Sequence, residues 1–225
     1  MGLRLVNIWY KYSGGEWVLK NVSINFEKGR IYVLIGPNAV GKTTLLKIAG
    51  LIYRPVRGEV YIDDKNFWEL DDREKSIVRR NVVYVHEKPV LIRGSVLYNI
   101  AYGFLLRGVE KEKALITARE YVVGKGFEYL LDKDSKELSA GETQLTALLR
   151  AFILKPKYLL LDEPFTNIDF RNRKKIINII YELKRESGIV IATHDLYIAE
   201  KLGDMIYLFE NDKVEKIVDL REYFE

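Results

Sequence analysis

Cysteine is absent from this sequence of 225 residues, and methionine, histidine and proline are scarce, with two, two and five residues respectively. Without cysteine the chain can form neither a disulfide nor a metal site built from thiolates. No run of eighteen uncharged apolar residues occurs, so the sequence predicts no helix that spans a bilayer. The first residues also lack the apolar stretch of a signal peptide. Together these absences favour a protein of the cytosol.

The sequence also lacks a concentration of charge of one sign. Its 36 basic and 32 acidic residues are interspersed, giving a net charge of +4 and a pI near 9.0. There is no basic tail, and the short cluster 171–175 lies on an expected helix, where such clusters are more often solvated faces. We therefore expect no direct contact with nucleic acid. The hydrophobic share of 48% is enough for one large domain, or one domain with an inserted subdomain.

A glycine-rich segment lies between an apolar run and a helical pattern. Residues 31–35 are apolar and partly β-branched, which predicts a buried strand, and apolar residues from Leu45 to Leu51 follow at helical spacing. The segment between them matches G-x-x-x-x-G-K-[ST] at every fixed position and is followed by Thr44; it consists of Gly36, Pro37, Asn38, Ala39, Val40, Gly41, Lys42 and Thr43.

A strand, a glycine loop and a helix in this order predict a phosphate cradle. The glycines let backbone N–H groups converge on an anion at the start of a helix. Lys42 supplies a charge for the β- and γ-phosphates, and Thr43 supplies a hydroxyl for Mg²⁺. The sequence therefore predicts a site for a nucleoside triphosphate and Mg²⁺.

The N-terminal region predicts an antiparallel pair of strands. Residues 3–8 and 17–26 alternate apolar and polar side chains and are separated by a turn at 13–15. Tyr10 and Tyr12 lie near the end of the first strand. Such a tyrosine is more commonly core or surface filler, but its ring could also stack on a purine base.

The middle of the chain changes from strand to helix. Strands are expected at 57–63 and at 81–85, the second ending at His86 and Glu87. From about residue 95 to 136 the apolar spacing becomes helical, with one helix expected over 110–123. We interpret this block as a helical subdomain inserted between strands of the sheet.

The motif Ser-x-x-Glu at Ser139 and Glu142 has two interpretations. Ser-x-x-Glu is a capping box, which needs no function beyond a stable helix start. The same helix start, with Ala140 and Gly141, can also present free N–H groups to a phosphate. Taken alone, the capping box would be the preferred interpretation.

Two carboxylates follow the next apolar strand. Residues 158–161 are apolar, and Asp162 and Glu163 come directly after them. Ligands bind beyond the carboxyl ends of strands in such sheets. Asp162 is therefore expected to hold Mg²⁺ through the water shell of the ion, and Glu163 to polarise a water for attack on the γ-phosphate.

The last third of the sequence continues the alternation of strand and helix. A loop containing Asp169 leads into a helix expected over 170–187, and a buried strand at 188–193 ends at His194. A single histidine is usually structural, but at this strand end its ring could touch the γ-phosphate or orient the water. Residues 204–210 and 213–218 predict a hairpin turned at residues 211–212.

In this order, the motifs resemble those of the nucleotide-binding subunit of ABC transporters over nearly the whole chain. The landmarks are an aromatic residue (Tyr12, with Tyr10 as the rival), the phosphate loop, a glutamine-type loop at Glu87, the signature at 138–142, the Asp162–Glu163 pair, the loop with Asp169 and the switch histidine His194. The resemblance implies a single α/β domain of the P-loop NTPase fold. A RecA-like core of about 1–87 and 155–225, with a mostly parallel sheet and an N-terminal antiparallel subdomain, would carry a helical subdomain at about 88–154.

The resemblance also implies the arrangement of the site. Two ATPase chains, identical or paired, would dimerise head to tail around two ATP molecules. Ser139 and Gly141 of one chain would contact the γ-phosphate held by the other. Roles in catalysis fall to Lys42, Glu163 and His194. Mg²⁺ would be held by Thr43, Asp162 and Glu87. ATP would be contacted by Tyr12, the loop 36–44, Glu87, Ser139, Gly141 and Asp169.

The resemblance further implies ATP hydrolysis coupled to transport. A separate integral-membrane permease would be the partner, with the subunit bound at the inner face of the cell membrane and a solute-binding protein in the same system. Importers of prokaryotes commonly keep the ATPase and the permease on separate chains, so the resemblance favours import. The segment 89–103 looks like subunits that serve tungstate, molybdate or phosphate. The alternative is an ABC ATPase acting on nucleic acid or ribosomes, but those relatives carry two nucleotide domains or a long coiled coil.

Three positions depart from the family pattern. Glu87 stands where glutamine is usual, and Ala140 and Glu142 replace Gly and Gln of the usual signature. Glu87 can still ligate Mg²⁺ but adds negative charge near the phosphates. Ala140 is small enough unless a positive φ is required, and Glu142 suits the helix dipole but could weaken binding of a nearby anion. We expect activity that is slower than typical.

Overall fold

The computed structural model describes residues 2–210 and 213–217, and within them the chain divides into two compact units. Of the described residues, the first unit contains 2–84, 157–163, 184–210 and 213–217, and the second contains 85–156 and 164–183. The second unit thus includes the segment 164–183 in addition to the block of helices that the sequence places at about 88–154. Among the described residues, no helix is both long enough and apolar enough to cross a membrane.

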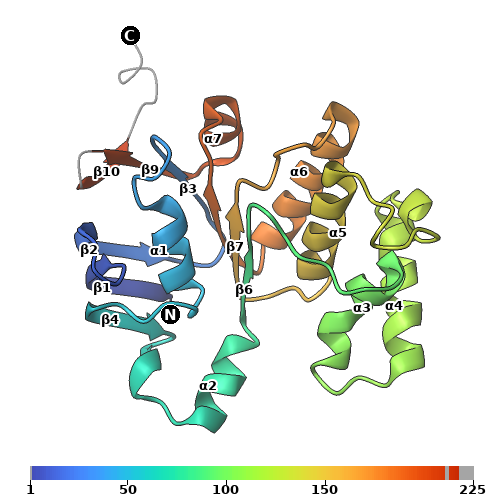
Figure 1. Ribbon diagram of the computed structural model, residues 1–225, viewed down its shortest axis with the longest axis horizontal. Helices are drawn as coiled ribbons and strands as arrows, with labels where there is room; N and C mark the ends of the chain where they lie inside the picture. Colours follow the sequence, from blue (N-terminus) through green and yellow to red (C-terminus); the bar gives the residue numbers. More distant parts are fainter. Residues whose placement is uncertain (1, 211–212, 218–225) are drawn as a thin grey trace. The chain divides into compact units, whose positions relative to one another are not determined.

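Two sheets form the first unit (Figure 1). The four-stranded sheet has the order β2-β1-β4-β5 and is antiparallel, with β1 at Leu3–Lys11, β2 at Trp17–Phe26, β4 at Arg57–Ile62 and β5 at Lys65–Asn66. The six-stranded sheet has the order β10-β9-β3-β8-β7-β6, with β3 at Ile31–Ile35, β6 at Val82–Val85, β7 at Tyr158–Asp162, β8 at Gly188–Ala192, β9 at Met205–Glu210 and β10 at Lys213–Ile217. This confirms the mixed α/β fold, with an antiparallel N-terminal sheet and a mostly parallel core.

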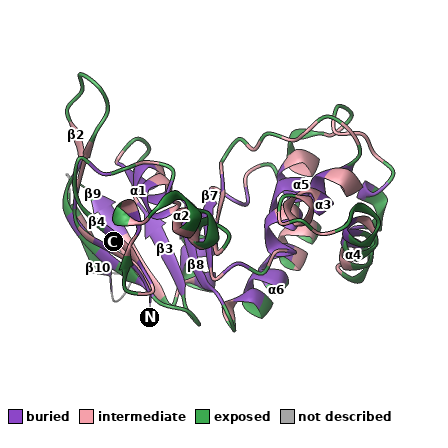
Figure 2. Cartoon of the chain, turned by 90° about the horizontal axis from the view of Figure 1, so that it is seen from below, coloured by how far each residue is buried: buried purple, intermediate pink, exposed green. Residues whose placement is uncertain are grey.

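The inner strands of the six-stranded sheet are parallel and fully buried. β3 pairs in parallel with β8 and β9, and β7 pairs in parallel with β8. Every residue of β3, β7 and β8 is buried, as Figure 2 shows by colour. Their continuous apolar sequences are those of strands covered on both faces. β9 and β10 pair antiparallel as expected, but the predicted turn at 211–212 lies outside the described residues.

The first strand is longer than its alternation predicts. β1 extends to Lys11, so Tyr10 lies within the strand and only Tyr12 follows it. The pairing of β1 with β2 shifts register after Leu5, and Asn7 has a φ of 51°. A bulge of this kind breaks the period-two alternation without ending the strand, which is why the sequence pattern stops at residue 8.

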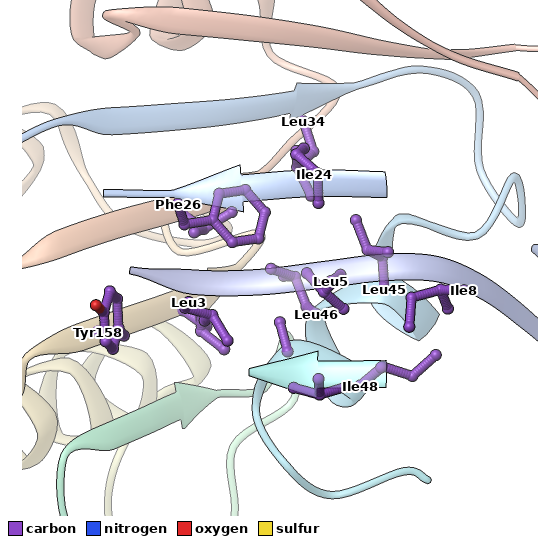
Figure 3. Close-up of a cluster of buried hydrophobic side chains, with 14 of the residues drawn as sticks. Leu3, Leu5, Ile8, Ile24, Phe26, Leu34, Leu45, Leu46, Ile48 and Tyr158 are labelled. Carbon is purple, nitrogen blue, oxygen red and sulfur yellow. The ribbon is translucent and has the colours of Figure 1, made fainter. Parts of the chain in front are cut away.

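Helix α1 (Lys42–Ala49) connects the two sheets of the first unit. It contacts β1 and β2 of the antiparallel sheet as well as β7 and β8 of the parallel sheet. Its apolar face, with Leu45, Leu46 and Ile48, packs against side chains of β1 and β2 in one buried cluster (Figure 3). The helix that begins at the phosphate loop is therefore anchored by the core of the unit.

Two further helices and a short 3₁₀ turn complete the first unit. α2 spans Asp72–Arg79, α7 spans Leu196–Leu202, and the 3₁₀ turn spans Phe67–Glu69. α2 has no buried residue, whereas α7 buries three side chains and contacts β3.

The second unit is helical. Its helices are α3 (Val96–Leu105), α4 (Lys111–Gly124), α5 (Ala140–Phe152) and α6 (Phe170–Lys184, whose last residue is assigned to the first unit), with a 3₁₀ turn at Glu128–Leu130. α3 contacts both α4 and α5. α6 is shorter than the predicted 170–187 and ends at Lys184. The carbonyl of Ser187, at the entry to β8, accepts a hydrogen bond from the N–H of Gly29, 3.1 Å away.

Candidate functional site

The residues of the first unit that are expected to bind nucleotide follow the carboxyl ends of three parallel strands, β3, β7 and β8. Asp162 pairs with Ala192 across β7 and β8, and Leu34 pairs with Ala192 across β3 and β8. The phosphate loop, Glu163 and Thr193 therefore all begin at the same edge of the sheet. This is the edge at which ligands bind in open parallel sheets.

The backbone of the phosphate loop needs its glycines. Gly36 has a φ of 142°, and a Cβ there would lie 2.2 Å from the carbonyl oxygen of Phe209. Gly41 has a φ of 110° and is the N-cap of α1. Ala39 also has a positive φ, of 64°, although it is not glycine. The loop is thus held in a conformation that few L-residues adopt.

Lys42 is buried beneath this loop. The residue is only 7% exposed, and its Nζ donates to the carbonyl oxygens of Gly36 (2.6 Å) and Pro37 (2.7 Å). Burial lowers the pKa of Lys42, and the carboxylates of Glu163 and Asp162 oppose that shift. An ammonium group with so little water around it interacts strongly with an anion.

Asp162 and Thr43 bring hard oxygen atoms together. Asp162 is 2% exposed, and its Oδ1 accepts from the hydroxyl of Thr43 at 3.1 Å. Its Oδ2 accepts from the hydroxyl of Tyr84 at 2.9 Å. Carboxylate and hydroxyl oxygens are suitable ligands for Mg²⁺ or for its bound waters. Among residues 2–210 and 213–217, no cluster of three or more His, Cys, Asp or Glu side chains could hold a metal ion.

Glu163 is surrounded by hydrogen-bond donors from the end of β8. One carboxylate oxygen accepts from the Thr193 hydroxyl (3.0 Å), and the other accepts from the backbone N–H of His194 (3.1 Å) and lies 2.8 Å from its Nδ1. Glu163 has a φ of 44°. This left-handed backbone turns the chain sharply after β7, and such strained residues cluster at functional sites.

The aromatic residues near the first strand form a cluster beside α1. The Tyr12 hydroxyl lies 3.0 Å from Oγ1 of Thr44, and Tyr12 is 45% exposed. Tyr10 instead stacks on Tyr53 with ring centroids 5.5 Å apart and packs against the core. Of the two tyrosines, Tyr12 thus has the more accessible ring, and it lies beside the residue that follows the phosphate loop.

The capping box at the start of α5 is confirmed. The Ser139 hydroxyl accepts from the N–H of Glu142 (3.3 Å), and the Glu142 carboxylate accepts from the N–H of Ser139 (3.0 Å). Glu142 also accepts from Nζ of Lys133 at 2.5 Å. Lys133 and the Ser139 N–H together hold the pKa of the Glu142 carboxyl below its usual value. Ala140 is the first residue of the helix and does not have a positive φ, so its methyl group is accommodated.

A pocket of about 530 Å³ adjoins this helix start within the second unit. A Cβ on Gly141 would lie 2.3 Å from the carbonyl oxygen of Asn167, so these two segments pack backbone to backbone. Asp169 accepts from the N–H groups of Arg171 and Asn172, and the latter is the principal cause of its lowered pKa. The pocket is lined by Tyr129, Ser139, Gly141, Glu142, Leu145, Asn167, Ile168, Asp169 and Asn172.

The residues that the sequence singles out therefore fall into two groups. Tyr12, the phosphate loop with Thr44, Asp162, Glu163 and His194 belong to the first unit. Ser139, Gly141 and Asp169 line one pocket of the second unit, and Glu87 is an exposed residue of that unit.

Sequence reasoning missed three polar contacts of these groups. Thr193 and Tyr84 bond the two carboxylates, and Lys133 bonds Glu142. Thr193 could have been noted as a polar residue that ends an apolar strand. Tyr84 and Lys133 carry no such signal. A tyrosine in a strand is normally interpreted as an apolar core residue, and a lysine in a loop as a solvent-exposed one.

The comparison with protein families gives a clear result. The model of the ABC transporter family, ABC_tran, matches residues 19–166 of this chain. The Tungstate uptake system ATP-binding protein TupC of Peptoclostridium acidaminophilum is 38% identical, over 95% of this chain and 97% of its own length. A putative ABC transporter ATP-binding protein of Pyrococcus furiosus is 36% identical, over 99% of this chain and 85% of its own.

Solved structures agree in fold. The dimeric ABC transporter cassette MJ0796 is 29% identical, with a TM-score of 0.86, over 95% of this chain and 96% of that chain. A second structure of that cassette is described as a dimeric post-hydrolysis state bound to ADP and Pi, with a TM-score of 0.86.

Proposed function

This chain belongs to the ABC transporter family as an ATP-binding subunit that hydrolyses ATP, and from that premise we propose that it powers solute movement through a separate membrane permease. The observation that carries the proposal is the grouping of Lys42, Asp162 and Glu163 at one sheet edge. Lys42 is nearly dehydrated, and Glu163 is held by donors from β8. The alternative of an ATPase acting on nucleic acid or ribosomes is not favoured, since the relatives are transporter subunits.

ATP binds through the phosphate loop. The N–H groups of Gly36 and of residues 38–44 surround the β- and γ-phosphates at the start of α1. On binding, the Lys42 ammonium exchanges its bonds to the carbonyls of Gly36 and Pro37 for bonds to phosphate oxygens. Tyr12 provides a flat, accessible ring for the adenine base.

The donor set beside the loop fits Mg²⁺. Thr43 would hold the ion directly, and Asp162 would hold it through its water shell. The resemblance to the family adds Glu87, of the second unit, as a further oxygen ligand. Mg²⁺ held by these residues would supply positive charge that neutralises the phosphate oxygens. Two hydroxyl groups, those of Thr43 and Tyr84, donate to Asp162 and orient its carboxylate.

Glu163 is the general base. Its carboxylate accepts a proton from the water that attacks the γ-phosphate, and His194 orients the carboxylate and contacts the phosphate. The 2.8 Å contact between His194 Nδ1 and Glu163 supports this pairing. Thr193 holds the other carboxylate oxygen, which leaves the base in a defined orientation.

The site is completed by a second chain. Two subunits close head to tail, and Ser139 and Gly141 of each contact the γ-phosphate bound by the other. The start of α5 would present backbone N–H groups to that phosphate, as the N-termini of phosphate-binding helices do. Asp169 lies in the same pocket of the second unit as Ser139 and Gly141, which suits a shared interface.

Two substitutions separate the steps of this mechanism. Glu163→Gln should keep ATP affinity, abolish turnover and trap a dimer, because the γ-phosphate is bound but not cleaved. Lys42→Ala should lose nucleotide affinity instead, because it removes the charge that faces the phosphates. ATP binding, phosphate release and molecular mass in solution with ATP would be measured for both variants. Wild-type phosphate release by Glu163→Gln would refute the assignment of the base.

The relatives suggest the transported solute. TupC is named for tungstate uptake, and the segment 89–103 resembles subunits serving such oxyanions. We propose an importer of an oxyanion, with the subunit cytoplasmic and bound at the inner face of the membrane, and with a solute-binding protein outside. Co-purification after mild detergent extraction should recover a multi-span permease. Recovery of ribosomes or nucleic acid without a membrane protein would favour the alternative.

A further inference from the structure

Asp162 is a buried carboxylate with two hydroxyl donors. Thr43 bonds its Oδ1 at 3.1 Å, and Tyr84 bonds its Oδ2 at 2.9 Å. The two donors lie on different elements: Thr43 belongs to the phosphate loop and α1, and Tyr84 belongs to β6, which neighbours β7 in the sheet.

We infer that Tyr84 is a positioning residue for Asp162, which fixes the plane of the carboxylate that faces Mg²⁺. This inference rests on the proposed function of Asp162. The ring of Tyr84 packs against the buried cluster, and α1 ends beside it at Gly50, where a Cβ would lie 3.2 Å from the Tyr84 Cβ. The hydroxyl therefore belongs to a ring that is packed against the core beside α1, and not to a mobile surface side chain.

The fixed position of the Tyr84 hydroxyl matters because metal affinity depends on how the ligands are oriented. Partners that orient a metal-binding carboxylate typically alter affinity or activity by about 10- to 100-fold when removed. Tyr84 acts on a residue that contacts the ion through water, so a smaller effect of about 3- to 10-fold is expected, below that range. The effect should fall on the dependence on Mg²⁺ and leave the remainder of the nucleotide site unchanged.

Tyr84→Phe removes the hydroxyl and keeps the ring, and the chain offers a matched control. Tyr158, at the opposite end of β7 from Asp162, is fully buried and donates to Asp63 at 3.3 Å. Tyr158→Phe therefore deletes a tyrosine–carboxylate bond of the same kind in the same sheet, away from the phosphate loop. Any general effect on stability should appear in both variants.

Affinity for a fluorescent, non-hydrolysable ATP analogue would be measured with excess Mg²⁺ and with EDTA. For Tyr84→Phe we expect affinity in Mg²⁺ to fall by about 3- to 10-fold while affinity in EDTA stays at the wild-type value. The Mg²⁺ concentration for half-maximal ATP hydrolysis should rise by a similar factor. Tyr158→Phe should change none of these quantities.

The outcomes are distinguishable. Tyr84→Phe with wild-type dependence on Mg²⁺ would overturn the inference, and so would equal losses in Mg²⁺ and in EDTA, which would indicate a structural role only. A wild-type chain whose affinity is the same with and without Mg²⁺ would instead overturn the proposed metal site, and the role of Tyr84 with it.

Discussion

At the scale of single residues, Gly141 shows that one glycine can be required for two separate reasons. The sequence pattern assigns it to a phosphate contact, where a small residue exposes N–H groups. In the structure its Cα also faces the carbonyl oxygen of Asn167 so closely that a Cβ would lie 2.3 Å from it. Because the obstacle is backbone, the contact cannot relax by a change of rotamer.

Gly141→Ala should therefore destabilise the folded chain even without nucleotide. Forcing a methyl group into a filled space typically costs about 1–3 kcal/mol. Gly124→Ala is the matched control, since Gly124 ends α4 with open space around it, and alanine favours helix by up to about 1 kcal/mol. Thermal unfolding without nucleotide should show a lower Tm for Gly141→Ala alone. Equal Tm values for the two variants would contradict the packing argument.

Two of the three contacts that sequence reasoning missed join residues far apart in the sequence. Tyr84 and Asp162 are 78 positions apart, and Thr193 and Glu163 are 30 apart. Motifs report residues that are close in sequence or that have fixed chemistry, as Lys42 and Asp162 do. A hydroxyl that serves a carboxylate on another strand depends on sheet order and register, which no local pattern specifies.

At the scale of secondary structure elements, the start of α5 combines a capping box with an ion pair. Glu142 replaces the usual glutamine, yet its charge is matched by Lys133 at 2.5 Å. The pairing also explains why an acidic residue is tolerated in a helix start expected to bind phosphate: the added negative charge is balanced within the same unit.

This ion pair makes a specific prediction about acid stability. The folded-state pKa of Glu142 lies below its unfolded value of about 4.5. Its contribution is therefore fully present above about pH 4.5 and is lost as the pH falls through the folded-state pKa. Glu142→Gln should cost at most about 1 kcal/mol at neutral pH, and the difference from wild type should vanish in acid.

Urea unfolding from about pH 7 down to about pH 3 would measure this difference. Lys133→Met should reproduce the loss at neutral pH and likewise converge with wild type in acid, because it removes the partner charge. A difference that stayed constant across the whole series would show that Glu142 stabilises α5 through some other contact.

The elements themselves were predictable where local patterns were strong. The buried strands β3, β7 and β8 and the helices α1 and α4 lie close to where apolar period and caps place them. Prediction failed where tertiary contacts override the pattern. The bulge at Asn7 interrupts the alternation within β1, and the strand continues beyond it to Lys11. α2 buries no side chain, so its sequence carries no apolar stripe to reveal it.

At the scale of the whole molecule, the division into two units has a functional consequence. The loop and the carboxylates proposed to bind the chain's own nucleotide belong to the first unit, whereas Ser139 and Gly141, proposed to contact the partner's nucleotide, and Asp169 belong to the second. If the site is completed by a second chain, one chain with bound nucleotide should change the dynamics of its first unit only. The second unit should respond when a dimer closes.

Amide hydrogen exchange can separate these two responses. A dilute wild-type monomer with ADP and Mg²⁺ should gain protection at residues 36–45 but not at 138–145, because the helix start of α5 faces no phosphate. Glu163→Gln with ATP and Mg²⁺ should gain protection at both segments, since binding shifts local opening equilibria wherever the ligand or partner makes contact. Adding Lys42→Ala to Glu163→Gln should remove both gains. Protection of 138–145 in the ADP-bound monomer would mean that the α5 helix start responds to nucleotide within its own chain, and the head-to-tail site would then be wrong.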